Sequence, residues 1–423
     1  MILTTISAAL LDINGLPLLW IAGVFGWTAG VILFPDAPVV LKVQVILIAL
    51  TGLALLVIAS FYGEPIKPNS IITANTGLLS MIAAVGFLKL VVIPPNQQSS
   101  QLPQGSKAFL QTLIGLNISS SIINVSAPIL IADRIHQQRP LDRFTAQSMV
   151  RVFCGVSNWS PFFGAMAVVL TYVENASLSW IIIAGLPFTL IGFILVYLEA
   201  RIRYKSQVEN FVGYPMQYNA LKVPVVLIMT VTLGTTLFPS LPVLLVISAS
   251  ALLVTLATLI IREGTTRAFN LLRVHVVQGL PRMVNELNLF LVAGILAVGI
   301  SGLLVTGILE NPFNTFDVIT AIELLLLIWL VGIIGIHPVI MISGLSPMIL
   351  SLNPDPNLLA ITYLIGWHLG TCSNPLSGTN LVFQGRYGIP GWKIAFWNWP
   401  YALVMFLIAT LWLSFVAGWF PKM

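Results

Sequence analysis

Uncharged apolar stretches recur along the whole chain, and they constrain its fold more than any other feature. A bilayer needs roughly 20 apolar residues per α-helical crossing, and apolar runs between polar breaks give about thirteen candidate segments. Only 8% of the 423 residues are charged and 57% are hydrophobic, whereas soluble domains carry roughly a quarter charged residues. The chain is therefore predicted to be an all-α polytopic membrane protein.

The basic residues indicate how these segments are oriented. Most of the 19 lysines and arginines fall in alternate loops, which places those loops and the N-terminus in the cytoplasm. The net charge of +5 is explained by these loops, so no nucleic-acid partner is expected. The stretch MILTTISAALLDINGL has no basic residue before its apolar part, and we expect the first helix to remain in the mature protein. The predicted location is the bacterial inner membrane.

Two pairs of segments resemble each other within the chain. IGLNISSSIINVSAPIL (114–130) is similar to IGIHPVIMISGLSPMIL (334–350), and CGVSNWSPFFGAM (154–166) to GTCSNPLSGTN (370–380). Equivalent segments are an odd number of crossings apart, so the halves are predicted to be inverted repeats. Inverted repeats are typical of secondary transporters, which bind substrate where the repeats meet.

The repeat predicts the domain organisation. Residues 1–207 form the first repeat, with a hairpin and a broken helix at about 108–173. Residues 208–240 form a connector with one helix. Residues 241–423 form the second repeat, with a hairpin and a broken helix at about 318–385. An amphipathic arm is expected over 262–282, because Phe269, Leu272 and Val276 share one face among arginines.

A proline follows each Ser-Asn pair and is expected to break the helix there. Proline lacks the amide hydrogen and clashes with the preceding turn. Freed carbonyls with Ser, Thr and Asn oxygens suit a small hard cation such as Na⁺, and amide groups at the next helix start suit an anion. Simple helix packing by these small polar residues is the alternative. The candidate Na⁺ ligands are Asn117, Ser119, Ser157, Asn158, Ser343, Ser373, Asn374 and Gly378.

No Asp or Glu lies deep inside the matched segments, which favours sodium over a proton as the coupling ion. A proton could instead be carried by His337 or His368, although a packing role is the alternative for each. His337 aligns with Asn117, which favours polar contacts at both positions. The two cysteines, Cys154 and Cys372, form no C-x-x-C motif, and no cofactor other than a coupling ion is expected.

At Ser157-Asn158 and Ser373-Asn374 the chain resembles the ion transporter superfamily, which includes the divalent anion/sodium symporters. In those symporters a paired Ser-Asn-Thr motif binds substrate carboxylates. Here Trp159 and Pro375 occupy the third positions, and Thr379 and Asn380 are the candidates for the missing groups. The resemblance implies an elevator mechanism, re-entrant hairpins and a homodimer. The substrate-binding candidates are Ser157, Asn158, Ser373, Asn374, Thr379 and Asn380.

The predicted function is sodium-coupled symport of a small organic anion, a di- or monocarboxylate. The alternatives are a cation/proton antiporter, a metalloid-oxyanion exporter, or a membrane subunit that needs a solute-binding partner. An enzyme is not expected, because the sequence contains no HExxH, GxSxG or Walker motif.

Overall fold

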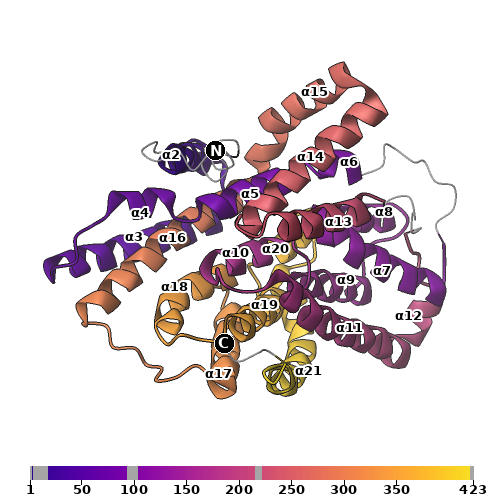
Figure 1. The fold of residues 1–423 in the computed structure, drawn as a ribbon. Helices are drawn as coiled ribbons and strands as arrows, with labels where there is room; N and C mark the ends of the chain where they lie inside the picture. The colour runs from indigo at the N-terminus through magenta and orange to yellow at the C-terminus, as the bar shows by residue number, and fades with distance from the viewer. Residues whose placement is uncertain (1, 3–17, 93–102, 215–221, 420–423) are drawn as a thin grey trace.

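The computed structural model describes residues 2, 18–92, 103–214 and 222–419, which are almost entirely helical (Figure 1). Most of the stretch predicted to precede the first helix, residues 1 and 3–17, lies outside the described residues. The α-helices are α2 (Leu18–Leu33), α3 (Val39–Phe61), α4 (Pro68–Thr73), α5 (Thr76–Gly86), α6 (Lys89–Val92), α7 (Ser106–Ile123), α8 (Ser126–His136), α9 (Arg143–Gly155), α10 (Gly164–Tyr172), α11 (Leu178–Arg203), α12 (Lys205–Glu209), α13 (Lys222–Leu237), α14 (Val243–Glu263), α15 (Thr265–Val274), α16 (Val284–Thr306), α17 (Val318–Ile333), α18 (Pro338–Leu350), α19 (Pro356–Ser373), α20 (Gly378–Tyr387) and α21 (Gly391–Val416).

Seven helical stretches of the described chain are long and apolar enough to cross a bilayer. The all-helical class predicted from the sequence is therefore confirmed, and so is the presence of several apolar helices, although fewer than the thirteen candidate segments qualify as spans. At the start of the region 108–173, for which the sequence predicts a hairpin and a broken helix, the chain forms the two helices α7 and α8. The chain turns between them at Asn124, which has a φ of +48°. Asparagine tolerates this left-handed region better than most residues do.

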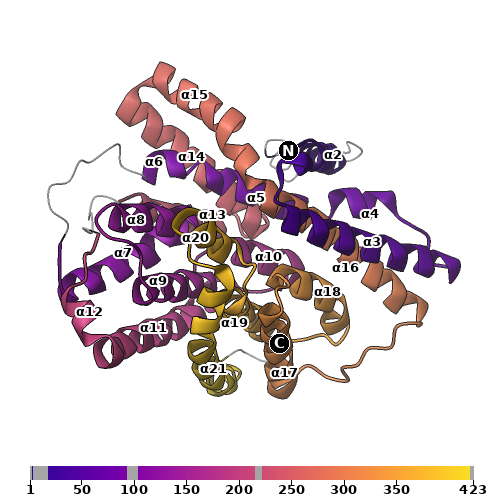
Figure 2. The same cartoon turned by 180° about the vertical axis from the view of Figure 1, so that it is seen from behind.

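Helix α19 lies at the centre of the molecule, in contact with α9, α11, α17 and α21 (Figures 1 and 2). Every residue from Asn357 to Ser373 is buried, although the helix carries His368, Thr371 and Ser373. At one end of the molecule α3 packs along α16, and α5 packs along α14. The polar segments singled out in the sequence thus lie in the core of the protein.

The order of elements in 106–203 recurs in 318–416. Each region has a helical hairpin (α7–α8, α17–α18), a broken helix (α9–α10, α19–α20) and a long final helix. The final helices α11 and α21 both have 26 residues, and each has a proline at its tenth position, Pro187 and Pro400. The two regions are therefore built from the same series of elements.

Candidate functional site

The first broken helix changes course at its Ser-Asn pair. Helix α9 passes into a short 3-10 turn over Val156–Asn158, and α10 begins only at Gly164. We call residues 156–163 the first break. It contains Pro161, and Ser157 and Asn158 are fully buried within it. The break expected from the proline is present.

Asn158 connects the first break to two other helices. Its side-chain nitrogen Nδ2 lies 3.2 Å from Thr189 Oγ1 on α11 and 3.1 Å from His368 Nδ1 on α19. Thr189 in turn donates to the Gly155 carbonyl at 2.8 Å. Ser157 donates to the Cys154 carbonyl at 2.8 Å. The amide end of Asn158 is thus fixed, and its oxygen Oδ1 remains for another partner.

The main-chain oxygen of Asn158 lies directly against Gly185 of α11. A Cβ atom at position 185 would lie 1.8 Å from this oxygen, so α11 and the break could not keep their separation. We expect Gly185→Ala to destabilise the protein by about 1–3 kcal/mol, as overpacked cores are. Thermal unfolding of the purified protein measures this effect. Gly385→Ala is the matched control, because a Cβ there meets no atom within 4 Å. Equal stability of the two variants would contradict this packing.

The second broken helix repeats the design with different contacts. Helix α19 ends at Ser373 and α20 begins at Gly378, and we call residues 374–377 the second break. Asn374 Oδ1 accepts from the Leu376 amide at 2.7 Å. Asn380 Nδ2 donates to the Asn374 carbonyl at 2.8 Å, so α20 folds back onto the break. This break was also expected from its proline.

In both regions the turn of the hairpin touches the break. Ser160 in the first break donates to the Ser121 carbonyl at 2.5 Å, and Asn124 donates to the Phe162 carbonyl at 3.3 Å. In the second region Asn374 donates to the Ile336 carbonyl at 3.0 Å. The turn of each hairpin therefore contacts the break of the broken helix in its own region.

Unpartnered polar atoms concentrate at these turns and breaks. Nine buried side-chain nitrogen and oxygen atoms of the described residues have no protein partner. Five of them belong to residues in or within about one helical turn of a break or a hairpin turn, namely Ser120, Asn158, Trp159, Thr371 and Asn380. Two are amide oxygens, one at each break. A buried polar atom without a partner costs about 1–3 kcal/mol, so such atoms in a native protein indicate a ligand or a water.

The second half of each broken helix begins beside open space. A Cβ at Gly164 or at Gly378 would meet no other atom within 4 Å. Each glycine is the first residue of its helix, α10 or α20, where amide groups lack intrahelical partners. At both helix starts a small group could therefore approach the amide donors, and at the exposed Gly378 it could do so from the surface.

The other predicted site residues have more varied positions. Asn117 of α7 donates to the Val152 carbonyl of α9 at 3.1 Å, one turn before the first break. Ser119, also in α7, is partly buried. Ser343 is fully buried in α18 and donates to the Val339 carbonyl at 2.7 Å. Thr379 is buried in α20, while Gly378 is exposed.

The alignment of His337 with Asn117 is wrong in structural terms. Asn117 lies inside α7, whereas His337 is the N-cap of α18 and accepts from the Val339 amide at 3.2 Å. The first hairpin turns at Asn124 and the second at 334–337, so the two sequences match in composition but not in register. His337 packs edge-on against Trp367, with ring centroids 4.9 Å apart.

Arg151 is a buried residue of the site that the sequence did not reveal. The distribution of basic residues assigned Arg151 to a cytoplasmic loop, but its side chain is only 3% exposed. It forms an ion pair with Glu199 and donates to Asn398 Oδ1 at 2.9 Å and to the Trp397 carbonyl at 3.0 Å. Arg151 also lies inside a predicted apolar segment, and this position could have shown from the sequence that its charge is buried. An arginine there needs several partners.

The partners of Arg151 lead to both breaks. Asn398 Nδ2 donates to the Cys372 carbonyl at 3.4 Å, next to the second break. The guanidinium also lies 4.9 Å from the centroid of the Tyr401 ring, whose hydroxyl is 3.4 Å from His368 Nε2. The other ring nitrogen of His368 faces Asn158. One polar network thus runs from Glu199 to the two breaks.

The thiols of Cys154 and Cys372 interact with each other, although both are unoxidised and buried. Each lies within four residues of the asparagine of its break, so α9 and α19 cross where the breaks begin. These are the only cysteines of the chain. We expect one mercuric ion to protect both thiols from a thiol reagent added after denaturation. A need for two mercuric ions per molecule would mean that the thiols are apart.

A surface contact also joins the two regions. Arg386 of α20 pairs with Asp133 of α8 at 2.5 Å, and the Tyr387 hydroxyl donates to the same carboxylate at 2.7 Å. Burial is the main cause that raises the pKa of Tyr387, and the Asp133 carboxylate raises it further. The first hairpin is thereby tied to the second broken helix.

The oxygens that the hairpin turns and the breaks leave without partners are uncharged. Among the described residues no group of three or more His, Cys, Asp or Glu side chains could hold a metal ion. Glu323, the carboxylate within α17, is exposed. Any cation held at the breaks would therefore be bound by amide, hydroxyl and carbonyl oxygens.

No known family model matches the chain, and a search of curated proteins found no matching sequence. Among solved structures the chain is similar to the Alcanivorax borkumensis YdaH transporter, described as having an unusual topology. The two chains are 13% identical over 81% of this chain and 84% of that one, with a TM-score of 0.47. At this level the similarity carries no argument about function.

Proposed function

We propose that this protein is a secondary active transporter that couples the movement of Na⁺ to that of a small organic anion, a mono- or dicarboxylate. The observation that carries the proposal is the pair of buried, unpartnered amide oxygens, Asn158 Oδ1 and Asn380 Oδ1, one at each helix break. Oxygen ligands without a formal charge suit a small monovalent cation. A Na⁺ ion would satisfy oxygens that the protein leaves without hydrogen bonds.

The anion is proposed to bind beside the cation, at the starts of α10 and α20. The open space at Gly164 and Gly378 adjoins these helix N-termini, whose amide groups and dipoles favour negative charge. Cation and anion would then lie close enough to attract each other. Each ion would raise the affinity of the other, which is the coupling that symport requires.

The proposed mechanism uses two inverted repeats and an elevator movement. The hairpins and broken helices, α7–α10 and α17–α20, would form the moving transport domain. Helices α2–α6 and α13–α16 would form the scaffold and the surface of a homodimer. Support comes from the repeated element order. It also comes from the packing of two helices of the first repeat, α3 and α5, on two helices of the second, α16 and α14. The N-terminus is proposed to lie in the cytoplasm.

A second candidate couples the anion to a proton. It is favoured by His368, which lies between Asn158 and Tyr401 in the polar network. A proton arriving at His368 would remove the acceptor that faces Asn158 and would change the first break directly. In that case His368, rather than the amide oxygens, carries the coupling ion.

Uptake into proteoliposomes separates the two. Labelled mono- and dicarboxylates are screened with an imposed Na⁺ gradient, with an imposed pH gradient, and with K⁺ in place of Na⁺. The sodium proposal expects uptake driven by the Na⁺ gradient at constant pH. Uptake driven only by the pH gradient would support the second candidate, and no uptake of any anion in either gradient would contradict both.

A further inference from the structure

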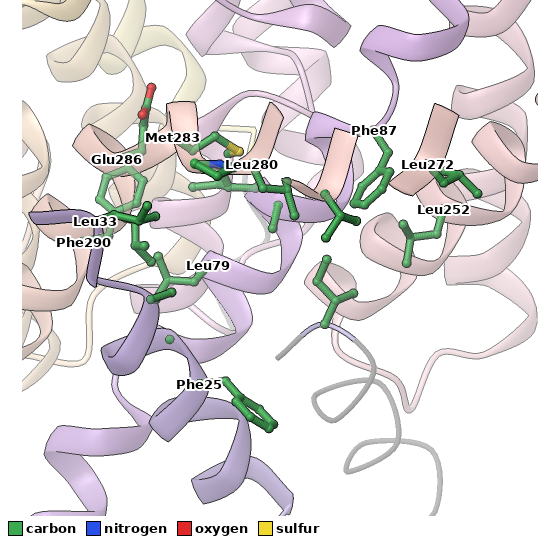
Figure 3. A pocket seen from close by; sticks show the side chains of 18 of the residues that line it. Phe25, Leu33, Leu79, Phe87, Leu252, Leu272, Leu280, Met283, Glu286 and Phe290 are labelled. Atoms are coloured by element: carbon green, nitrogen blue, oxygen red, sulfur yellow. The ribbon is translucent and has the colours of Figure 1, made fainter. Parts of the chain in front are cut away.

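A large apolar pocket lies away from the breaks, between α2, α5, α14, α15 and α16 (Figure 3). Its volume is about 810 Å³, which is within the roughly 300–1,000 Å³ of small-molecule sites. Phe25, Leu79, Leu252, Leu272 and Phe290 are among its lining residues. The pocket is thus large enough for a hydrophobic ligand and does not share its walls with the proposed transport site.

The apolar face expected for the arm contributes to this pocket. Phe269, Leu272 and Val276 all line it, and Phe269 and Val276 remain largely exposed at its edge. Phe25, from the apolar helix α2, is also largely exposed. In a membrane such residues face lipid, so the pocket can be entered by an acyl chain from the bilayer.

Charged groups gather at one side of the pocket. Glu286 is the charged residue in the lining, and in Figure 3 its carboxylate lies at the edge of the cluster, turned away from Leu79 and Phe25. Arg282 lies between the lining residues Pro281 and Met283 in the chain. Lys89 begins α6, two residues after the lining residue Phe87, and is within electrostatic range of Glu286 and Arg282. Five ion pairs join residues of the described chain, and none of these three side chains takes part.

A buried imidazole lies in the same place. His275 packs on Phe87 of the pocket wall with ring centroids 4.7 Å apart, and Lys89 is within its electrostatic range. The side chain is 9% exposed, and its Nε2 atom has no protein partner. This polar atom without a partner, near the charge of Lys89, indicates that this side of the pocket contacts a polar group.

We propose that the pocket binds a membrane phospholipid with an amine-bearing headgroup, independently of the transport function proposed above. One acyl chain fills the apolar pocket, the phosphate lies at Lys89 and Arg282, and the ammonium group donates to Glu286. Two cations beside one carboxylate complement a phosphate beside an amine. A second copy of the chain would offer no such headgroup, and a purely apolar ligand would leave all three charges unused.

The test measures lipid binding to the purified, delipidated full-length protein by native mass spectrometry. Phosphatidylethanolamine, phosphatidylcholine and phosphatidylglycerol with identical acyl chains are compared. We expect phosphatidylethanolamine to bind roughly tenfold more tightly than the other two, the effect of one charge-assisted hydrogen bond. Soluble phosphoethanolamine should not compete, because it has no acyl chain. Equal binding of the three lipids would overturn the assignment of Glu286.

Variants locate the lipid. Glu286→Gln should remove the preference for phosphatidylethanolamine, and Lys89→Gln with Arg282→Gln should weaken all three phospholipids. Ala83→Trp fills the pocket and should abolish binding. Arg267→Gln is the control, because this arm arginine is 73% exposed and pairs with Glu263. Unchanged lipid binding in Ala83→Trp would overturn the proposal, and so would a change of oligomeric state without loss of lipid, which would assign the pocket to a second copy.

Discussion

Asn158→Ala and Asn380→Ala are each expected to abolish sodium-driven uptake while leaving the protein folded. Each substitution removes one of the two unpartnered amide oxygens at the breaks. We expect the apparent Na⁺ affinity to fall by about a hundredfold or more. Mutation of a residue that only hydrogen-bonds to a metal ligand already lowers metal affinity by roughly 10–100-fold. The measurement is initial uptake rate against Na⁺ concentration in proteoliposomes that contain equal amounts of each variant.

Two controls accompany these variants. Asn314→Ala replaces an exposed loop asparagine and should behave as the wild type. Asn158→Asp keeps an oxygen at the Oδ1 position and replaces the amide donor to Thr189 by a second, charged oxygen, so Na⁺ binding that survives in this variant would show that the oxygen rather than the amide hydrogen bond is required. If Asn158→Ala and Asn380→Ala both transport at the wild-type rate, these asparagines only pack helices.

Arg151→Gln is expected to have the second large effect. It breaks the ion pair with Glu199 and the bonds that lead to Asn398 and to Trp397. Loss of one partner of a buried ion pair costs about 3–5 kcal/mol. Thermal unfolding of the purified protein should show this loss, and uptake should fall as well, because the network reaches both breaks.

Arg203→Gln is the matched control, because Arg203 and Arg151 share one carboxylate partner. Arg203 pairs with the same Glu199 at 3.3 Å, but its side chain is 69% exposed. An exposed pair contributes at most about 1 kcal/mol, so this variant should be close to the wild type. Arg151→Lys keeps the charge but cannot make all three contacts. If it folds normally and still shows weaker Na⁺ dependence, Arg151 positions the breaks. Equal effects of Arg151→Gln and Arg203→Gln would contradict the role of the buried network.

The apolar spans and the helix breaks could be predicted from the sequence because both depend on local chemistry. Helix α3, Val39–Phe61, for example, is an apolar run that the sequence alone marks as a span. Pro161 and Pro375 disfavour helix at their positions, and each follows a Ser-Asn pair, which marks the breaks in the sequence. Proline alone is not sufficient, because Pro187 and Pro400 lie inside the continuous helices α11 and α21. The apolar face of the arm was readable for the same reason, because helical spacing decides which residues share a face.

What the sequence did not reveal depends on tertiary contacts. The sequence predicts a hairpin within 108–173 but not that it turns at Asn124, where the asparagine has a left-handed conformation that the hairpin packing fixes. The burial of Arg151 depends on Glu199 and Asn398, which lie far away in the sequence. Likewise, the pairing of Asn158 with His368 needs α9 and α19 to cross, and no local pattern predicts it.

The central claim is that the two breaks hold a sodium ion with neutral oxygens, and equilibrium binding of radioactive Na⁺ to the purified protein tests it most directly. Choline keeps the ionic strength constant, and the pH is held fixed. The account predicts saturable Na⁺ binding that Asn158→Ala and Asn380→Ala abolish and that Asn314→Ala preserves. Absence of saturable binding in the folded wild-type protein, or equal binding in all four proteins, would contradict it.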